Sequence, residues 1–192
     1  MIDSLINIII PCFNSIHELK QTLDSIARQT KIRGTRIIVL DKGSTDGTHQ
    51  YAHQASIEYK RVLNINVVEA KENNFPLTKE ELKNYLIWIS PGTTLDSSDS
   101  IMNIVNNIDH IIDFCIYKRK KINPFSYVID RVNLKRGHLQ IECLICKKED
   151  VSFIEYFKEN NRMSFKLLKD PNISKIRILR ENILSQKKTT IN

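Results

Sequence analysis

The chain has 192 residues, of which 41% are hydrophobic and 27% charged, and its formal net charge at pH 7 is +7. This length fits one globular domain that buries roughly 70% of the surface its unfolded form exposes. The apolar runs, such as residues 111–117, are all far shorter than the ~20 residues that a membrane-spanning helix needs. The composition is therefore that of an ordinary globular protein with no sign of a transmembrane helix.

The start of the chain has no basic stretch ahead of its first apolar run. We therefore expect no cleaved signal peptide and a cytoplasmic location. Cysteine usage agrees, because all four cysteines lie in apolar, strand-like runs, where a cysteine acts as a small buried hydrophobe. Cys143 and Cys146 have no second ligand pair for zinc, and residues three apart on a strand point to opposite faces.

The excess of 29 basic over 22 acidic residues suggests an anionic partner: a phosphate-bearing substrate, an acidic membrane surface or a nucleic acid. Basic residues gather at 117–122, at 133–138 and in the tail, without any nucleic-acid-binding motif. Solvated basic loops are the simpler interpretation of such runs. We expect no nucleic-acid partner, whereas peripheral contact with the inner face of an acidic membrane stays open.

Strand and helix patterns alternate through the first 110 residues. Continuous apolar runs predict buried strands, and apolar stripes at helical spacing predict helices that begin at capping residues. The predicted strands are 5–13, 36–41, 65–70 and 85–90, and the predicted helices are 16–30, 49–59 and 97–108, with a capping box from Thr78 to Glu81. Asn14 or Ser15 is expected to cap the first helix and Thr48 the second.

The pattern changes after residue 110. Segments 111–120, 125–134 and 138–148 are interpreted as strands, and segment 149–163 as a helix. The predicted fold is α/β, with a mainly parallel, Rossmann-like sheet flanked by helices and antiparallel additions in the C-terminal half. We expect a single domain over residues 1–180 and a basic, frayed tail over 181–192.

The segments "INIIIPCFNSIHELKQTLDSIARQT" and "TRIIVLDKGSTDGTHQYA" resemble the opening of the family 2 glycosyltransferases, which have the GT-A fold. The resemblance is close over residues 6–52 and extends more weakly, in order and spacing, to about residue 160. The residues that carry it are Pro11, Phe13, Asn14, Leu23, Gln29, Asp41, Gly43, Ser44, Thr45, Asp46, Gly47 and Thr48.

The resemblance implies transfer of a sugar from a nucleoside diphosphate sugar, most often a UDP-sugar, to a glycan or lipid-linked acceptor, as in polysaccharide biosynthesis. The residues that it places around the nucleotide are Pro11, Phe13, Asn14, Asp41, Lys42, Gly43, Ser90 and Gly92. A carboxylate at the end of a strand can also accept hydrogen bonds from the edge of a base, which suits Asp41. Taken alone, residues 43–48 are equally a turn and a helix cap.

Two features depart from the family pattern. Lys42 stands where the family usually has a second aspartate. Residues 90–93, Ser-Pro-Gly-Thr, stand where the family has the Asp-x-Asp carboxylates that hold Mn²⁺ or Mg²⁺. Hydroxyls and a glycine cannot replace charged oxygen ligands for a hard cation, so we expect no metal ligand there. Asp96 is a weak candidate ligand, and both it and Asp99 are also ordinary turn and helix-start residues.

The resemblance places a catalytic base, usually an aspartate, near the start of a late helix. Glu149 and Asp150 are the candidates, with Glu155 and Glu159 behind them, and all four are equally residues of a solvated helix face. His49 and His53 lie four apart on one predicted helix face and lack the acidic neighbour of a zinc-protease motif. A surface position is the simpler interpretation of that pair.

Three hypotheses remain. The first is a compact family 2 glycosyltransferase that works without the usual cation, with Lys42 and the run Lys118 to Lys121 stabilising the diphosphate. The second is a catalytically inactive GT-A-like domain that binds a nucleotide sugar or assists an assembly. The third, an unrelated doubly wound domain, is disfavoured because no glycine-rich phosphate loop follows the first strand.

Overall fold

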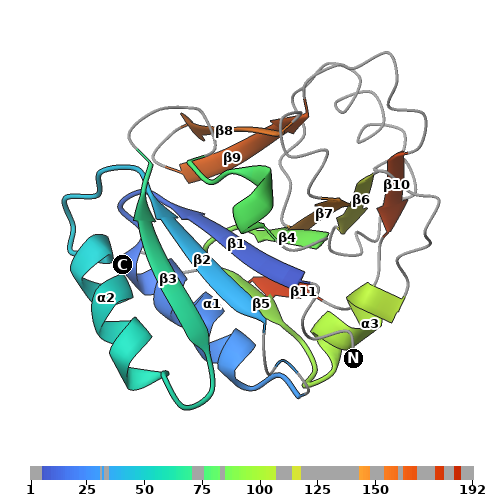
Figure 1. Cartoon of the computed structure of the whole chain (residues 1–192), viewed down its shortest axis with the longest axis horizontal. Coiled ribbons are helices and arrows are strands. Elements are labelled where there is room, and N and C mark those ends of the chain that lie inside the picture. The colour runs from blue at the N-terminus through green and yellow to red at the C-terminus, as the bar shows by residue number, and fades with distance from the viewer. Residues whose placement is uncertain are drawn as a thin grey trace.

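The structure, a computed structural model, describes residues 6–30, 32, 35–70, 76–82, 85–106, 114–117, 143–147, 154–159, 162–167, 176–179 and 184–186. Among them, one seven-stranded sheet organises the chain, with the strand order β10-β6-β7-β4-β1-β2-β3 (Figure 1). Its strands are β1 (Ile6–Cys12), β2 (Arg36–Asp41), β3 (Asn64–Glu69), β4 (Tyr85–Ile89), β6 (Phe114–Tyr117), β7 (Cys143–Lys147) and β10 (Ile176–Leu179).

The sheet is mixed and mainly parallel. β1 runs parallel to β2 and β4, β2 parallel to β3, and β6 parallel to β10. β7 runs antiparallel to both of its neighbours, β4 and β6. The prediction of a parallel sheet with antiparallel additions in the C-terminal half is therefore confirmed.

Two short strand pairs accompany the sheet. β5 (Thr93–Leu95) pairs antiparallel with β11 (Leu184–Gln186). Sequence reasoning did not predict β5, and β11 lies within the segment expected to be a frayed tail.

The second pair corrects the sequence interpretation. Segment 149–163 was predicted to be a helix, but its described part forms β8 (Ile154–Glu159), which pairs antiparallel with β9 (Arg162–Leu167). The helix prediction was wrong because Ile154, Tyr156 and Phe157 are residue types that favour a strand. Two asparagines separate the paired residues Glu159 and Arg162, and a two-residue connection of this composition is typical of tight hairpins.

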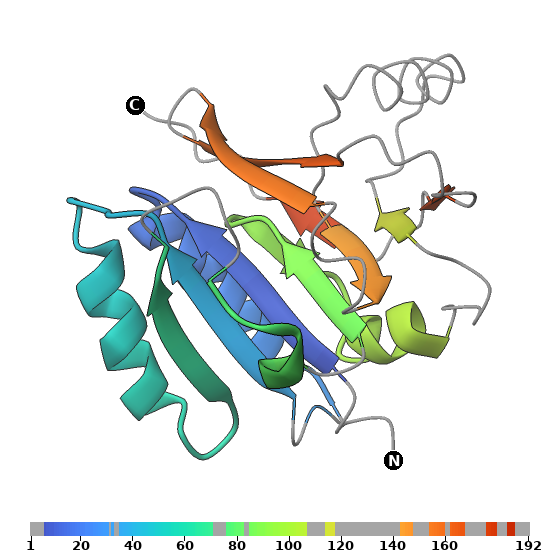
Figure 2. The ribbon, with the colours of Figure 1, turned by 45° about the horizontal axis from the view of Figure 1, so that its top comes forward.

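The helices α1 (Ile16–Ala27) and α2 (Thr48–Glu58) cover one face of the sheet (Figures 1 and 2). The hairpin of β8 and β9 lies over the opposite face, where β9 contacts β1 (Figure 2). The remaining helices are α3 (Ser100–Asn106) and η2 (Lys79–Glu81), a single 3₁₀ turn. Among the described residues no helix has both the length and the apolar composition to cross a membrane.

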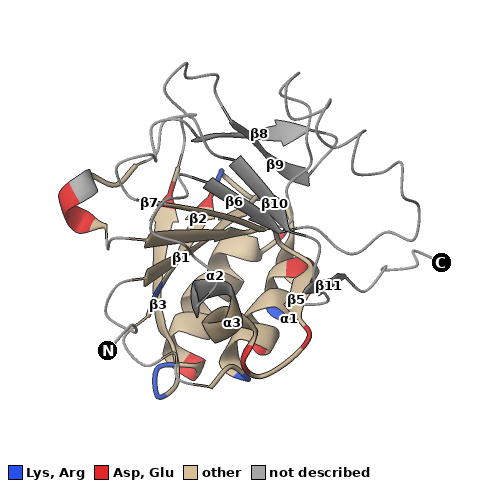
Figure 3. Cartoon of the chain, turned by 90° about the vertical axis from the view of Figure 1, so that its right-hand side faces the viewer, with Lys and Arg blue, Asp and Glu red and all other residues tan. Residues whose placement is uncertain are grey.

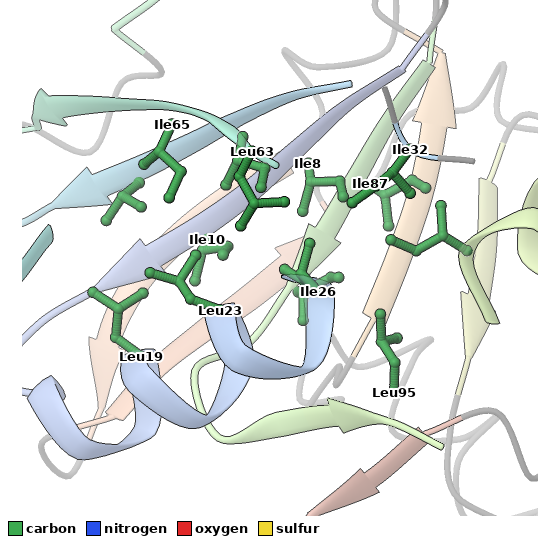
Figure 4. Close-up of a cluster of buried hydrophobic side chains, with 14 of the residues drawn as sticks. Ile8, Ile10, Leu19, Leu23, Ile26, Ile32, Leu63, Ile65, Ile87 and Leu95 are labelled. Carbon is green, nitrogen blue, oxygen red and sulfur yellow. The ribbon is translucent and has the colours of Figure 1, made fainter. Parts of the chain in front are cut away.

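The main core lies between α1 and the sheet (Figure 4). Leu19, Leu23 and Ile26 of α1 are fully buried against β1 and β4, as the predicted stripe requires. Burying three such side chains contributes roughly 5–9 kcal/mol before the entropy of ordering them is subtracted. α1 is therefore fixed against the strands whose ends carry the candidate site.

Helix ends follow the sequence in part. The capping box is confirmed, because the Thr78 N–H donates to Glu81 Oε2 at 2.8 Å. Hydrogen bonds from the backbone and side chain of Thr78 lower the pKa of the Glu81 carboxyl. Thr48 is the first residue of α2 rather than its cap; the capping position belongs to Gly47, which has a φ of 94°. Ser15 does cap α1 by position, but its side chain makes no capping hydrogen bond.

The described lysines and arginines lie scattered among the acidic residues rather than in one patch (Figure 3). The three basic runs noted in the sequence fall outside the described residues or at their margin. Cys12, Cys143 and Cys146 are buried, as predicted, and none of these three thiols is in a disulfide.

Candidate functional site

The candidate site is the edge of the sheet at which β1 to β4 end. The chain order changes direction at β1, which has β2 on one side and β4 on the other. In open α/β sheets, ligands bind outside the carboxyl ends of the strands at such a point. We call residues 12–16, 41–48 and 90–93 the carboxyl edge.

The first two segments of the carboxyl edge are joined by side-chain hydrogen bonds. The Asn14 N–H donates to Ser44 Oγ at 3.0 Å, and the Thr45 N–H donates to Asn14 Oδ1 at 2.8 Å. The Ser15 N–H donates to Thr48 Oγ1 at 2.9 Å. Asn14 adopts a positive φ of 44°, which asparagine tolerates better than most residues. The resemblance placed Asn14 at the nucleotide; the structure shows that it joins two loops.

Asp46 connects the beginnings of both helices. Its Oδ2 accepts from the Ile16 N–H at 3.2 Å, and its Oδ1 accepts from the Thr48 N–H at 3.0 Å. Partial burial by itself raises the pKa of the Asp46 carboxyl, but the hydrogen bonds from Thr48 and Ile16 outweigh it and lower the pKa below its ordinary value. One carboxylate therefore serves the positive ends of two helix dipoles.

Asp41 points to the helix-covered side of the sheet and is 2% exposed. Its carboxylate accepts from the hydroxyl and, at 3.3 Å, from the N–H of Ser44. Gly43, between them, has a φ of 76° and open space where a Cβ would stand. Asp41 therefore holds the turn that follows β2, and its predicted contact with a base stays a prediction.

His49 approaches the same carboxylate. Its Nδ1 lies 3.2 Å from Asp41 Oδ2, in an orientation that does not make a hydrogen bond, and its Nε2 lies 4.0 Å from Glu69 Oε1. Its ring also packs edge-on against His53, with 4.7 Å between the ring centroids. Sequence reasoning missed these acidic neighbours because they come from β2 and β3, whereas the motif search considered only residues close in the chain.

The other predicted nucleotide-binding residues lie at the carboxyl edge or, for Pro11, directly before it. Pro11 is buried in β1, and Phe13 is half-buried directly after that strand. Lys42 is half-buried after β2, and its N–H donates to Cys12 O at 2.9 Å, which extends the pairing of β1 with β2 by one residue. Within the three segments of the carboxyl edge, Lys42 is the one lysine or arginine.

Residues 90–93 form a closed turn after β4. The Thr93 N–H donates to Ser90 O at 3.1 Å, and Gly92 has a φ of 84°. Proline second and a glycine of positive φ third are typical of a type II turn. Ser90 is half-buried and Gly92 is buried against α1.

The residues present at this turn do not fit a divalent metal ion. Hard cations take several oxygen ligands, usually from carboxylates, and residues 90–93 include no carboxylate. The described residues contain no group of three His, Cys, Asp or Glu side chains that could hold a metal ion.

The structure separates Asp96 and Asp99 from this turn. Gly92 contacts Glu18 in the first turn of α1, whereas Ser97 O accepts from Gln29 Nε2 just beyond the far end of that helix. The helix from Glu18 to its end at Ala27 has ten residues, which correspond to about 15 Å. Asp99 there accepts from the Thr30 hydroxyl, and Asp96 is exposed.

The four candidate bases fall in the segment that was predicted to be a helix. Glu149 and Asp150 lie outside the described residues, as does the run Lys118 to Lys121. Glu155 and Glu159, the further candidates, belong to β8 and therefore do not lie on the helix in which the sequence pattern placed them.

Structural comparison defines the fold. The mannosyltransferase PcManGT from Pyrobaculum calidifontis, in complex with GDP-Man and Mn²⁺, superposes with a TM-score of 0.63 and 14% identity, over 91% of this chain and 56% of that one. TarS residues 1–349 from S. aureus, in complex with UDP-GlcNAc, superposes with a TM-score of 0.60 and 17% identity, over 93% of this chain and 57% of that one. The fold is therefore the GT-A fold.

A third similar structure is glucosyl-3-phosphoglycerate synthase from Mycobacterium tuberculosis, in complex with Mn²⁺, UDP and phosphoglyceric acid. Its TM-score is 0.60 at 13% identity, over 95% of this chain and 70% of that one. At these identities the likeness establishes the fold. The chain spans less than two thirds of the length of the first two structures.

Sequence comparison agrees with the fold. Residues 7–76 match the family model of glycosyl transferase family 2, which confirms the resemblance found in the opening segments. No curated protein sequence matches the chain. The chain thus has the GT-A fold with the opening sequence of glycosyl transferase family 2, and it lacks that family's metal-binding carboxylates at residues 90–93.

Proposed function

We propose that this protein is a glycosyltransferase that moves a sugar from a nucleoside diphosphate sugar, with UDP as the first nucleotide to test, to a glycan or lipid-linked acceptor. The observation that supports this most is the carboxyl edge itself. Two loops that carry the family sequence are joined there by mutual hydrogen bonds, next to the point at which the strand order changes direction.

The residues proposed to contact the nucleotide have distinct chemistry. Phe13 offers an aromatic face on which a base can stack, and Lys42 offers a positive charge to a phosphate. Asp41 and Asn14 act mainly by holding the loops in position, because their side chains have partners within the chain. We propose Asp150 or Glu149 as the base that takes the proton of the acceptor hydroxyl as its oxygen attacks the anomeric carbon and the diphosphate leaves.

A second candidate function is a catalytically inactive domain that binds a nucleotide sugar for a partner. The closed turn at residues 90–93 favours it, because it stands where the family places the ligands of the metal ion that neutralises the leaving diphosphate. The two candidates share nucleotide binding and differ in turnover.

Calorimetric titration with UDP, and then with a panel of UDP- and GDP-sugars, tests the shared part. Phe13→Ala and Lys42→Ala are each expected to weaken binding at least about five-fold, since a lost stacking or charge contact costs about 1–3 kcal/mol. Ile57→Ala and Lys60→Ala are the matched controls, because both residues are exposed at the end of α2 remote from the carboxyl edge. Equal effects of test and control variants would place the nucleotide elsewhere.

Release of UDP from a bound UDP-sugar separates the two candidates. A transferase is expected to release UDP faster when an acceptor glycan is added, and Asp150→Asn or Glu149→Gln is expected to reduce that rate without changing UDP affinity. A binding domain is expected to hold the sugar nucleotide intact with every acceptor.

A further inference from the structure

We infer that this chain binds its nucleoside diphosphate ligand without a divalent cation, because the segment in the metal-ligand position is a closed turn bonded to α1. The inference rests on the proposed function for its ligand and goes beyond it in stating how the diphosphate is bound. It also goes beyond the missing carboxylates in the sequence, because it depends on where the backbone of residues 90–93 points.

The turn is attached to α1 through its backbone. The Gly92 N–H is shared between Glu18 O at 3.1 Å and Thr22 Oγ1 at 3.0 Å. The Thr22 hydroxyl in turn donates to Thr93 O at 3.0 Å. Thr22 and Thr93 are both fully buried. The Gly92 N–H and the Thr93 carbonyl are therefore directed to the helix and not to a ligand at the carboxyl edge.

The third position of the turn is also crowded for a side chain such as the family's carboxylate. A Cβ added to Gly92 would lie 3.3 Å from Glu18 Cγ and 3.6 Å from Glu18 Cβ, and the φ of 84° strains any side chain other than glycine. Restoring an aspartate at this position thus strains the backbone and requires the Glu18 side chain to shift.

The acidic groups elsewhere on the carboxyl edge are already in use. Asp41 is held by Ser44 and approached by His49, and Asp46 accepts from the amides that begin α1 and α2. A cation shared with a diphosphate needs several anionic oxygens directed at one point. Among the described residues, these carboxylates instead satisfy donors of the chain itself.

The test is a calorimetric titration of the whole chain with UDP in EDTA, in Mg²⁺ and in Mn²⁺. The inference expects the dissociation constants in the three buffers to agree within a factor of two. A constant at least ten-fold lower in Mn²⁺ or Mg²⁺ than in EDTA overturns it. If UDP binds in none of the buffers at millimolar concentration, the proposed function fails instead.

A second readout tests the inference when UDP does not bind. Mn²⁺ alone is added to the protein and its free ion is followed by electron paramagnetic resonance. The free signal is expected to equal that of buffer at each addition. Loss of one equivalent of free Mn²⁺ that is reversed by Ser90→Ala overturns the inference, because it places the ion at the turn.

Two aspartate variants test the closed geometry. Gly92→Asp and Gly43→Asp make the same change at the same kind of positive φ, but a Cβ at Gly43 meets no atom within 4 Å. Gly92→Asp is expected to melt several degrees below Gly43→Asp and to gain no Mn²⁺ dependence of UDP binding when combined with Ser90→Asp. Equal melting temperatures, or a double variant that binds UDP at least ten-fold more tightly with Mn²⁺, would show that the turn is open to a metal.

Discussion

The hydroxyl of Thr22 is the point at which α1 and the turn of residues 90–93 are joined, so Thr22→Val is the most direct perturbation of the site. Valine has nearly the same shape and removes only the hydroxyl. The change deletes the bond accepted from the Gly92 N–H and the bond donated to Thr93 O. The Gly92 N–H keeps Glu18 O as its acceptor, whereas Thr93 O, which belongs to a fully buried residue, loses the hydroxyl that donated to it.

The magnitude follows from those two bonds. Each intramolecular hydrogen bond contributes about 1 kcal/mol, and leaving a buried acceptor without its donor adds about 1–3 kcal/mol. The extra methyl group that valine buries offsets about 1 kcal/mol. The free energy of unfolding should therefore fall by about 2–4 kcal/mol, which lowers the melting temperature of a chain of this size by roughly 4–16 °C.

The assay is thermal and urea-induced unfolding followed by circular dichroism, for the wild-type protein and two variants. Thr45→Val is the matched control, because it removes an exposed hydroxyl whose hydrogen bond to Asn14 Oδ1 is long, at 3.5 Å, and therefore weak. Its unfolding free energy should change by less than about 0.5 kcal/mol. If Thr22→Val melts within a degree of Thr45→Val, the turn is not held by Thr22, and the argument for a closed turn loses its main support.

Three further predictions concern the loops and the core. The folded pKa of Asp46 lies below its ordinary value of 3.8, so the stabilisation by its carboxylate is present above that pH and is lost as the pH falls through the folded pKa. Asp46→Asn should therefore have a free energy of unfolding about 1 kcal/mol lower than wild type in urea at pH 7. The difference between the two proteins should shrink near pH 2. Asn14→Ala should lower the free energy of unfolding by about 1–2 kcal/mol in the same assay, and Asn14→Gly should lower it less, because glycine also tolerates the positive φ. Equal decreases for the two variants would assign the whole effect to the hydrogen bond with Thr45. Burial raises the pKa of the Cys12 thiol, so a disulfide reagent should modify it only when the protein unfolds, and rapid modification of Cys12 located by peptide mapping would contradict its position in the core.

The strands of the first half could be read from the sequence because their apolar runs are long and continuous. Ile8 and Ile10 are buried on one face of β1 and Ile9 on the other, as a strand covered on both faces requires. The stripe of α1 was equally plain, because Leu19, Leu23 and Ile26 recur at helical spacing. In the second half, segment 149–163 mixed both periods, and the helix prediction failed where pairing between β8 and β9 decided the structure.

By itself, the sequence determined the fold class, the loops of the GT-A family and the absence of carboxylates at residues 90–93, because these depend on residue type and on spacing within one segment. Only the tertiary structure decided how the residues act together. It directed Asp41 toward His49, placed Ser97, the neighbour of Asp96, beside Gln29 just past the end of α1, and joined Gly92 to Thr22, seventy residues away in the chain. Such contacts arise when the sheet brings distant segments side by side, and no local pattern in the chain encodes them.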